Sequence, residues 1–68
     1  MSYLVVIEQG ETGFGAYVPD LPGCASVGET AEEALSLIRE AIALHLEGLK
    51  REGLPVPEPR SHAELVSA

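Results

Sequence analysis

Carboxylates, two histidines and one cysteine are the side chains of this 68-residue chain that could do chemistry. Metal-dependent nucleases cluster several carboxylates around divalent ions. This sequence does not supply such a cluster, because the first predicted strand contains only one carboxylate, Glu8, at its end. The acids of the central stretch fall on the polar side of a predicted helix, where solvated acids are the norm: Glu32, Glu33, Glu40 and Glu47. We therefore predict no catalytic residue, no metal site, no cofactor and no enzymatic activity.

His45 and Cys24 are the remaining candidates for chemistry. His45 lies near the middle of the apolar side of the predicted helix, and the other histidine, His62, lies in the tail. A catalytic or metal role for His45 lacks a partner, so we expect a buried neutral imidazole bonded to a backbone carbonyl or a sheet side chain. Cys24 has no assured His or Lys neighbour to lower its pKa, which favours a small buried thiol over a nucleophile.

A short loop with the sequence DLPG is the candidate site for binding another protein. Its Pro-Gly pair suits the centre of a type II turn, because proline fixes φ and glycine accepts a positive φ. The loop is either a simple connection between two strands or a rigid protrusion that contacts a partner. In the second case the contact residues are Asp20, Leu21, Pro22 and Gly23.

One amphipathic helix, predicted over Thr30 to Arg51, positions these residues. Ile38 and His45 lie on its apolar face, which Leu37 and Leu44 border. Thr30 is a good N-cap residue, and Glu33, three residues later, completes a capping box. Gly53 and Pro55 end the helix. Thr30, Glu33, Ile38 and His45 are therefore the predicted structural residues.

Strands are predicted before the helix, at Tyr3 to Glu8, Phe14 to Val18 and Cys24 to Val27. After the helix, Leu54 to Pro59 has proline at every second position, which predicts an extended segment. Ser61 to Val66 is predicted to form one short helical turn, capped by Ser61.

This order of elements predicts one α+β domain over residues 1–68: a three-stranded antiparallel sheet (β-β-β-α) with one long helix on one face. A single helix cannot cover both faces of that sheet. Because both sides of Tyr3 to Glu8 are largely apolar, the uncovered face would expose a patch that a monomer should avoid. We therefore expect a homodimer or a larger oligomer that buries this face.

Charge and composition restrict the partners. The net charge is −7, with four basic residues against eleven acidic ones, which argues against direct binding to nucleic acid. No apolar run approaches the roughly 18 residues that a membrane-spanning helix needs. A single cysteine and an N-terminus without a signal-peptide pattern favour the cytoplasm.

A series of spaced residues over positions 3 to 64 resembles the HicB-like antitoxins. The matching positions are Phe14 to Cys24 (FGAYVPDLPGC), Ser26, Gly28, Thr30, Glu32 to Ala34, Ala41, Ile42, His45 to Glu47, and Pro55 to Pro59. The resemblance implies a degraded ribonuclease-H-like fold. It also implies that the chain is the antitoxin of a type II toxin-antitoxin system. Its partner would be HicA, a small basic toxin that cleaves messenger RNA and carries a catalytic histidine on a double-stranded-RNA-binding-domain-like fold.

Two features depart from the family pattern. Many HicB-like antitoxins continue into a C-terminal DNA-binding domain, whereas this sequence stops at Ala68, so we expect a short form that does not bind operator DNA. Some short members have no established toxin. The alternative function is therefore an orphan regulatory or ligand-binding module with the same fold.

Overall fold

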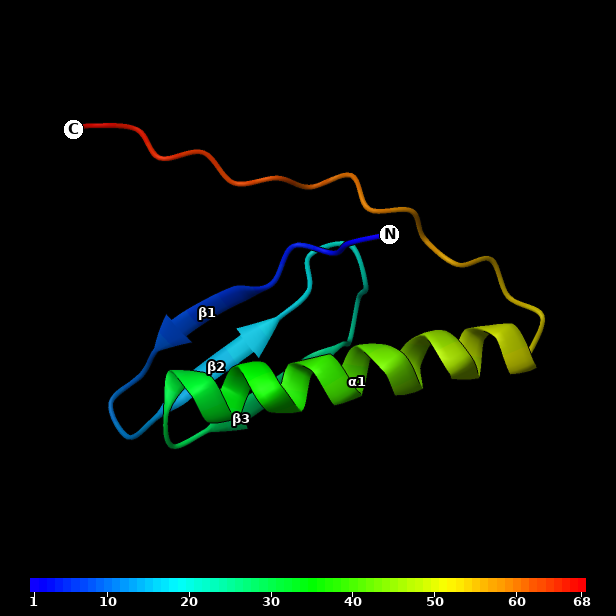
Figure 1. The fold of residues 1–68 in the computed structure, drawn as a ribbon, viewed down its shortest axis with the longest axis horizontal. Coiled ribbons are helices and arrows are strands. Elements are labelled where there is room, and N and C mark those ends of the chain that lie inside the picture. The colour runs from blue at the N-terminus through cyan, green and yellow to red at the C-terminus, as the bar shows by residue number, and fades with distance from the viewer.

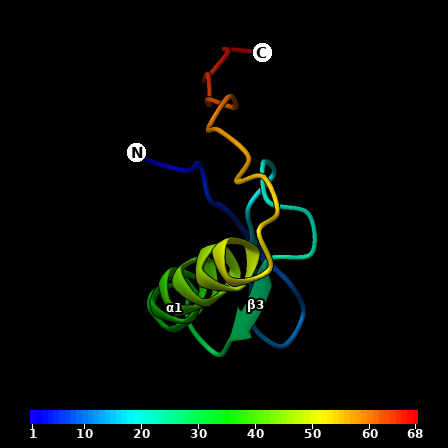
Figure 2. The same ribbon diagram turned by 90° about the vertical axis from the view of Figure 1, so that its right-hand side faces the viewer.

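The computed structural model describes residues 1–68 and contains three strands followed by one helix. They are β1 (Val6–Gln9), β2 (Phe14–Tyr17), β3 (Ala25–Gly28) and α1 (Ala31–Arg51). The strands form an antiparallel sheet in the order β1-β2-β3. Figures 1 and 2 show α1 lying along one face of this sheet and extending beyond its end. The predicted α+β fold is confirmed, while the ribonuclease-H kinship stays a prediction.

The bounds of the strands differ from those that the sequence predicts: β1 and β2 are shorter, and β3 has the predicted length but is shifted by one residue. β1 begins only at Val6, although Tyr3 and Val5 before it still pack against the core. β3 begins one residue later than expected, because the Cys24 amide donates to the Leu21 carbonyl (3.0 Å) and closes a turn. Gly23, inside this turn, has a φ of +84°, which confirms the predicted type II geometry.

The ends of α1 follow their sequence signals with one difference. Thr30 is the N-cap, and its hydroxyl accepts from the Glu33 amide at 3.0 Å. The Glu33 carboxylate, however, accepts from the Glu29 amide (3.0 Å), not from the Thr30 amide as a capping box requires. At the other end Gly53 has a φ of +70° and the Leu54 amide bonds back to the helix, which terminates it as predicted.

The core lies between β2, the loop after it and the first half of α1. Six residues are buried there: Ala16, Val18, Leu21, Cys24, Ala34 and Ile38. His45, two turns beyond Ile38, which is the last fully buried residue of the helix, is only half-buried and makes no hydrogen bond. The expectation of a buried, hydrogen-bonded imidazole is therefore wrong, because α1 extends past the end of the sheet (Figure 1) and its fully buried residues end at Ile38.

Residues 54–61, which we call the strap, run extended after the helix and cross back over the N-terminal part of the chain. The Tyr3 hydroxyl donates to the Pro57 carbonyl. The Asp20 carboxylate accepts from the Arg60 amide (2.9 Å), the Ser61 amide (2.9 Å) and the Ser61 hydroxyl (2.7 Å). These bonds join the strap to the N-terminus and to the loop after β2.

The helical turn predicted for Ser61 to Val66 is wrong, because the chain has no helix after Arg51. The Ser61 hydroxyl donates to Asp20 and therefore cannot cap a helix. Leu65 and Val66 are fully exposed, so a turn there would have no packing to stabilise it. Figure 1 shows this end of the chain leaving the body of the protein.

One face of the sheet is left open, as predicted. The register pairs Val6 with Tyr17, Tyr17 with Ala25, and Gly15 with Val27. Since the alternate residue Ala16 is buried under α1, these side chains point to the opposite side. Tyr17 is 42% exposed and Val27 is 77% exposed. The oligomer that we expect to bury this face stays a prediction.

Candidate functional site

An open hollow of about 690 Å³ lies at the end of the sheet where the β1–β2 turn approaches the start of α1. The antiparallel register brings the end of β1, the start of β2 and the end of β3 to this one place, through the pairs Gln9–Phe14 and Phe14–Gly28. Its lining includes four carboxylates, two apolar side chains and no basic residue. The four acids are Glu8, Glu11, Glu29 and Glu33, and the apolar residues are Phe14 and Val27.

Glycines allow the two sides of this hollow to approach closely. A Cβ added to Gly13 would lie 2.6 Å from the Gly28 carbonyl oxygen, and one added to Gly28 would lie 2.7 Å from the Ala34 amide nitrogen. Both contacts are with backbone, which cannot move aside as a flexible side chain can. The hairpin turn therefore lies close against the end of β3, and the end of β3 lies close against the first turn of α1.

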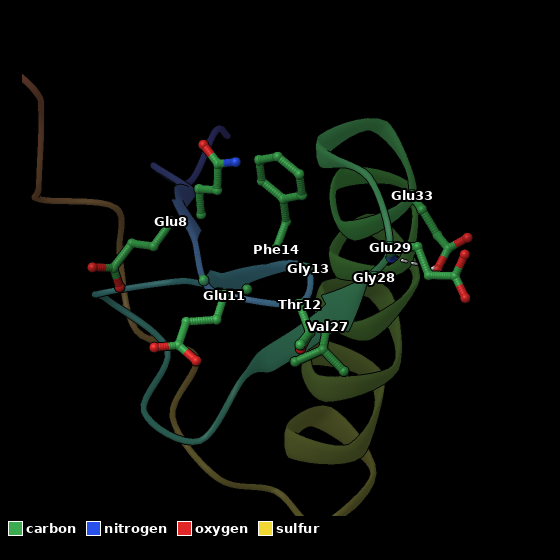
Figure 3. Close-up of a pocket in the computed structure, with 12 residues that line it drawn as sticks. Glu8, Glu11, Thr12, Gly13, Phe14, Val27, Gly28, Glu29 and Glu33 are labelled. Atoms are coloured by element: carbon green, nitrogen blue, oxygen red, sulfur yellow. Dashed lines mark hydrogen bonds between the residues drawn. The ribbon is translucent and has the colours of Figure 1, made fainter.

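The carboxylates line two opposite sides of the hollow. Figure 3 shows Glu8 and Glu11 on the hairpin side, Glu29 and Glu33 on the helix side, and the Phe14 ring between them. The only hydrogen bond among these acids is the one from the Glu29 amide to the Glu33 carboxylate. Phe14 lies on the side of the sheet that faces α1, and Val27 lies on the open side. The four exposed negative charges at this end of the sheet can attract a basic surface.

The DLPG loop divides into an anchored half and an exposed half. Leu21 is fully buried, and Asp20 is bound to the strap. Hydrogen bonds from the Arg60 amide, the Ser61 amide and the Ser61 hydroxyl hold the pKa of Asp20 below its usual value. Pro22 and Gly23 alone are exposed at the tip of the loop. Within the candidate contact loop, therefore, only these two residues are free to meet a partner without disturbing the fold.

The acidic hollow was missed by sequence reasoning. The sequence alone suggests for Glu8 a metal-ligand role, for Glu33 a solvated helix acid or a capping residue, and for Glu11 and Glu29 only a place in turns. The signal was present in the strand order, because an antiparallel β-β-β-α unit places its first turn and its last turn at the same end of the sheet. The four acids are 3, 18 and 4 residues apart, so their meeting depends on this topology.

Other candidates for chemistry stay isolated in the structure. Burial raises the pKa of the Cys24 thiol, which opposes a nucleophilic role. No group of three or more His, Cys, Asp or Glu side chains is arranged to hold a metal ion. The two ion pairs, Glu47–Arg51 and His62–Glu64, are both on the surface. α1 is not apolar enough over its length to cross a membrane.

Comparison with known proteins gives consistent results. The family model described as "HicB_like antitoxin of bacterial toxin-antitoxin system" matches residues 3–68. The protein named Antitoxin HicB 2 of Photorhabdus laumondii is 31% identical over 64 residues, covering 94% of this chain and 46% of that protein. UPF0150 protein Ta0767 of Thermoplasma acidophilum is 41% identical over 68 residues, covering 98% and 96% of the two chains.

A protein of Haemophilus phage HP1 is also similar, at 40% identity over 58 residues, covering 85% of this chain and 44% of that protein. The chain thus spans less than half the length of the phage protein and of the Photorhabdus antitoxin. Among solved structures, a chain of the "HicA3 and HicB3 toxin-antitoxin complex" matches with a TM-score of 0.73 and 37% identity. That match covers 87% of this chain and 70% of the other. The chain therefore belongs to the HicB-like antitoxins of bacterial toxin-antitoxin systems, a family of antitoxins and not of enzymes.

Proposed function

We propose that this chain binds a small basic toxin of the HicA type and inhibits it by covering its RNA-binding and catalytic surface. The observation that carries the proposal is the likeness, at 37% identity, to a chain of a solved HicA3–HicB3 complex. The net charge of −7 supports it, because a messenger-RNA-cleaving toxin needs a basic surface to hold its substrate. Such a complex would form in the cytoplasm, where messenger RNA is translated.

We assign the acidic hollow as the main toxin contact, with the exposed tip of the DLPG loop as a second candidate. Exposed ion pairs contribute only about 0–1 kcal/mol each, so the acids would act chiefly on encounter rate and specificity. Phe14 would supply apolar contact beside the carboxylates, whereas Val27 lies on the open sheet face that the proposed oligomer would cover. Binding should therefore weaken with added salt, with a screening length of about 8 Å at physiological ionic strength.

Co-expression with a neighbouring basic reading frame tests the proposal. The chain should rescue growth, co-purify with the toxin and suppress its RNA cleavage. The double variant Glu8→Lys/Glu11→Lys should lose at least about tenfold in affinity at low salt, mainly through a slower association rate. The matched control Glu40→Lys/Glu52→Lys makes the same change in net charge on exposed residues outside the hollow, and should retain most of the affinity.

Two outcomes would contradict this assignment. If both double variants lose affinity equally, only overall charge matters and the hollow is not the contact. If no encoded basic protein co-purifies with the chain, the orphan binding module becomes the better explanation.

Self-association through the open sheet face is part of the same proposal. Val6, paired with Tyr17, is the apolar residue of β1 whose side chain points away from α1. A Val6→Lys variant should therefore reduce the mass measured by sedimentation at micromolar concentration. A wild-type chain that sediments as a monomer there would refute the proposed oligomer.

A further inference from the structure

One flank of α1 carries an apolar stripe whose inner edge, at Ala41, packs against the core and whose two leucines are exposed. Its members, Leu37, Ala41, Leu44 and Gly48, follow one another at steps of four, three and four residues and so share one side of the helix. The N-terminal segment Met1–Val5 packs on the opposite flank. Leu37 is 39% exposed and Leu44 is 69% exposed, and Ala41 and Gly48 are half-buried between the core and this flank.

No packing contact within a single chain explains why a glycine occupies the position of Gly48. Glycine inside a helix costs about 1 kcal/mol relative to alanine. A Cβ added at Gly48 would have no atom within 4 Å, so neither the sheet nor the strap requires its absence. A glycine in the last turns of a helix, facing open space, does suit a second helix that packs closely against it.

The stripe is complementary to itself when it is reversed. Read from either end, its spacing is four, three and four residues, and large side chains alternate with small ones. An antiparallel second copy of α1 therefore places Leu37 against the second copy's Gly48, and Leu44 against the second copy's Ala41. Each leucine then fills the space above a small residue, which is how closely packed helices interlock.

The charges at the ends of the flank agree with this arrangement. Glu33 borders the stripe at its N-terminal end, and Arg51 lies on the same side of the helix at its C-terminal end. In the antiparallel pair of helices, Glu33 of one copy lies near Arg51 of the other. Arg51 is free to exchange partners, because its present bond to Glu47 (2.9 Å) joins two largely exposed side chains. This attraction offsets part of the repulsion between two acidic chains.

We infer that this flank of α1 is an interface between two copies of the chain, related by a two-fold axis that sets their helices antiparallel. The contact is isologous, so it closes as a dimer and does not propagate. It is separate from the open face of the sheet, which lies on the side opposite α1 (Figure 2). If both contacts form, the assembly has more than two chains.

Disulfide crosslinking tests the antiparallel register directly. The double variant Leu37→Cys/Gly48→Cys should form a covalent dimer on mild oxidation, because the two positions face each other across the interface. A bond within one chain is impossible, since 11 residues of helix separate the sites by about 16 Å, beyond the ~7 Å limit for a disulfide. The single variants Leu37→Cys and Gly48→Cys are the controls and should stay monomeric on a denaturing gel. Cys24 is buried and present in all three.

A second measurement does not depend on oxidation. Leu44→Glu should lower the sedimentation mass by a factor of two at the concentration where the wild type is assembled, with an unchanged circular dichroism spectrum, because Leu44 is exposed in the single chain. Val6→Lys, on the open sheet face, should leave the crosslink intact. Equal crosslinking of the double and single variants, no crosslinking at all, or an unchanged mass for Leu44→Glu would each overturn the inference. If a toxin, and not a second copy, binds this flank, one of these results is expected, and the inference is then wrong.

Discussion

Ile38→Ala should destabilise the fold strongly, because Ile38 is fully buried where α1 crosses the sheet. The change removes three carbon atoms at about 0.8 kcal/mol each, or about 2.4 kcal/mol of transfer free energy before any cavity is counted. Similar truncations in protein cores cost about 2–5 kcal/mol in total. A chain of this length has a free energy of unfolding of roughly 3–10 kcal/mol, so the variant should lie close to the limit of stability.

Thermal unfolding followed by circular dichroism measures this effect. A loss of about 3 kcal/mol corresponds to a fall in Tm of roughly 12–24 °C for a domain of this size. All variants must be compared at one protein concentration, because self-association makes Tm depend on concentration.

His45→Leu is the matched control, two turns further along the same side of the helix. His45 is half-buried and makes no hydrogen bond, so the change should alter the free energy of unfolding by less than about 1 kcal/mol. If His45→Leu lowers Tm as much as Ile38→Ala does, His45 contributes as much to stability as a fully buried residue, which contradicts its half-buried position.

Three further predictions concern the strap, the hollow and the buried thiol. Asp20→Asn should speed hydrogen exchange of the two strap amides that bond to it. In the wild type this protection should persist down to the ordinary pKa near 3.8 and fade only as the pH drops through the lower folded value, because a depressed acid pKa stabilises the ionised state. Gly28→Ala should cost about 1–3 kcal/mol by forcing backbone apart, whereas Gly15→Ala, whose added Cβ would have its nearest neighbour at 4.0 Å, should be tolerated in a melt. Cys24 should react with a thiol reagent at pH 8 at least about tenfold more slowly in the native chain than in urea, and equal rates would contradict its burial.

The helix and the sheet order could be predicted because their signals are local. The cap at Thr30, the glycine stop at Gly53 and the 3.6-residue spacing of apolar side chains act over a few residues each. The Pro22-Gly23 turn is likewise determined by its own two residues. The outcome for His45 could not be predicted in this way. Its burial depends on where the sheet ends relative to the helix, which helical periodicity does not report.

Long-range partners explain the other differences. Ser61 has the sequence of a helix cap, and only the distant Asp20 carboxylate takes its hydroxyl and amide away from that role. The acidic hollow depends on the same kind of information, because its four carboxylates come from β1, from the turns after β1 and before α1, and from the start of α1, which meet through strand pairing. The open sheet face could be predicted, since it needs only the count of elements and the apolar character of the first strand.

The strap also has a consequence for the order in which the chain folds. Its bonds join residues 54, 40 and 41 positions apart, far more distant than the partners in the hairpin. Closing so long a loop has an entropic cost that must be met before the contact is made, so distant contacts tend to form late. During synthesis, the hairpin, β3 and α1 emerge from the ribosome before Ser61 does. The sheet and helix can therefore assemble first, and the strap closes over them as the last step.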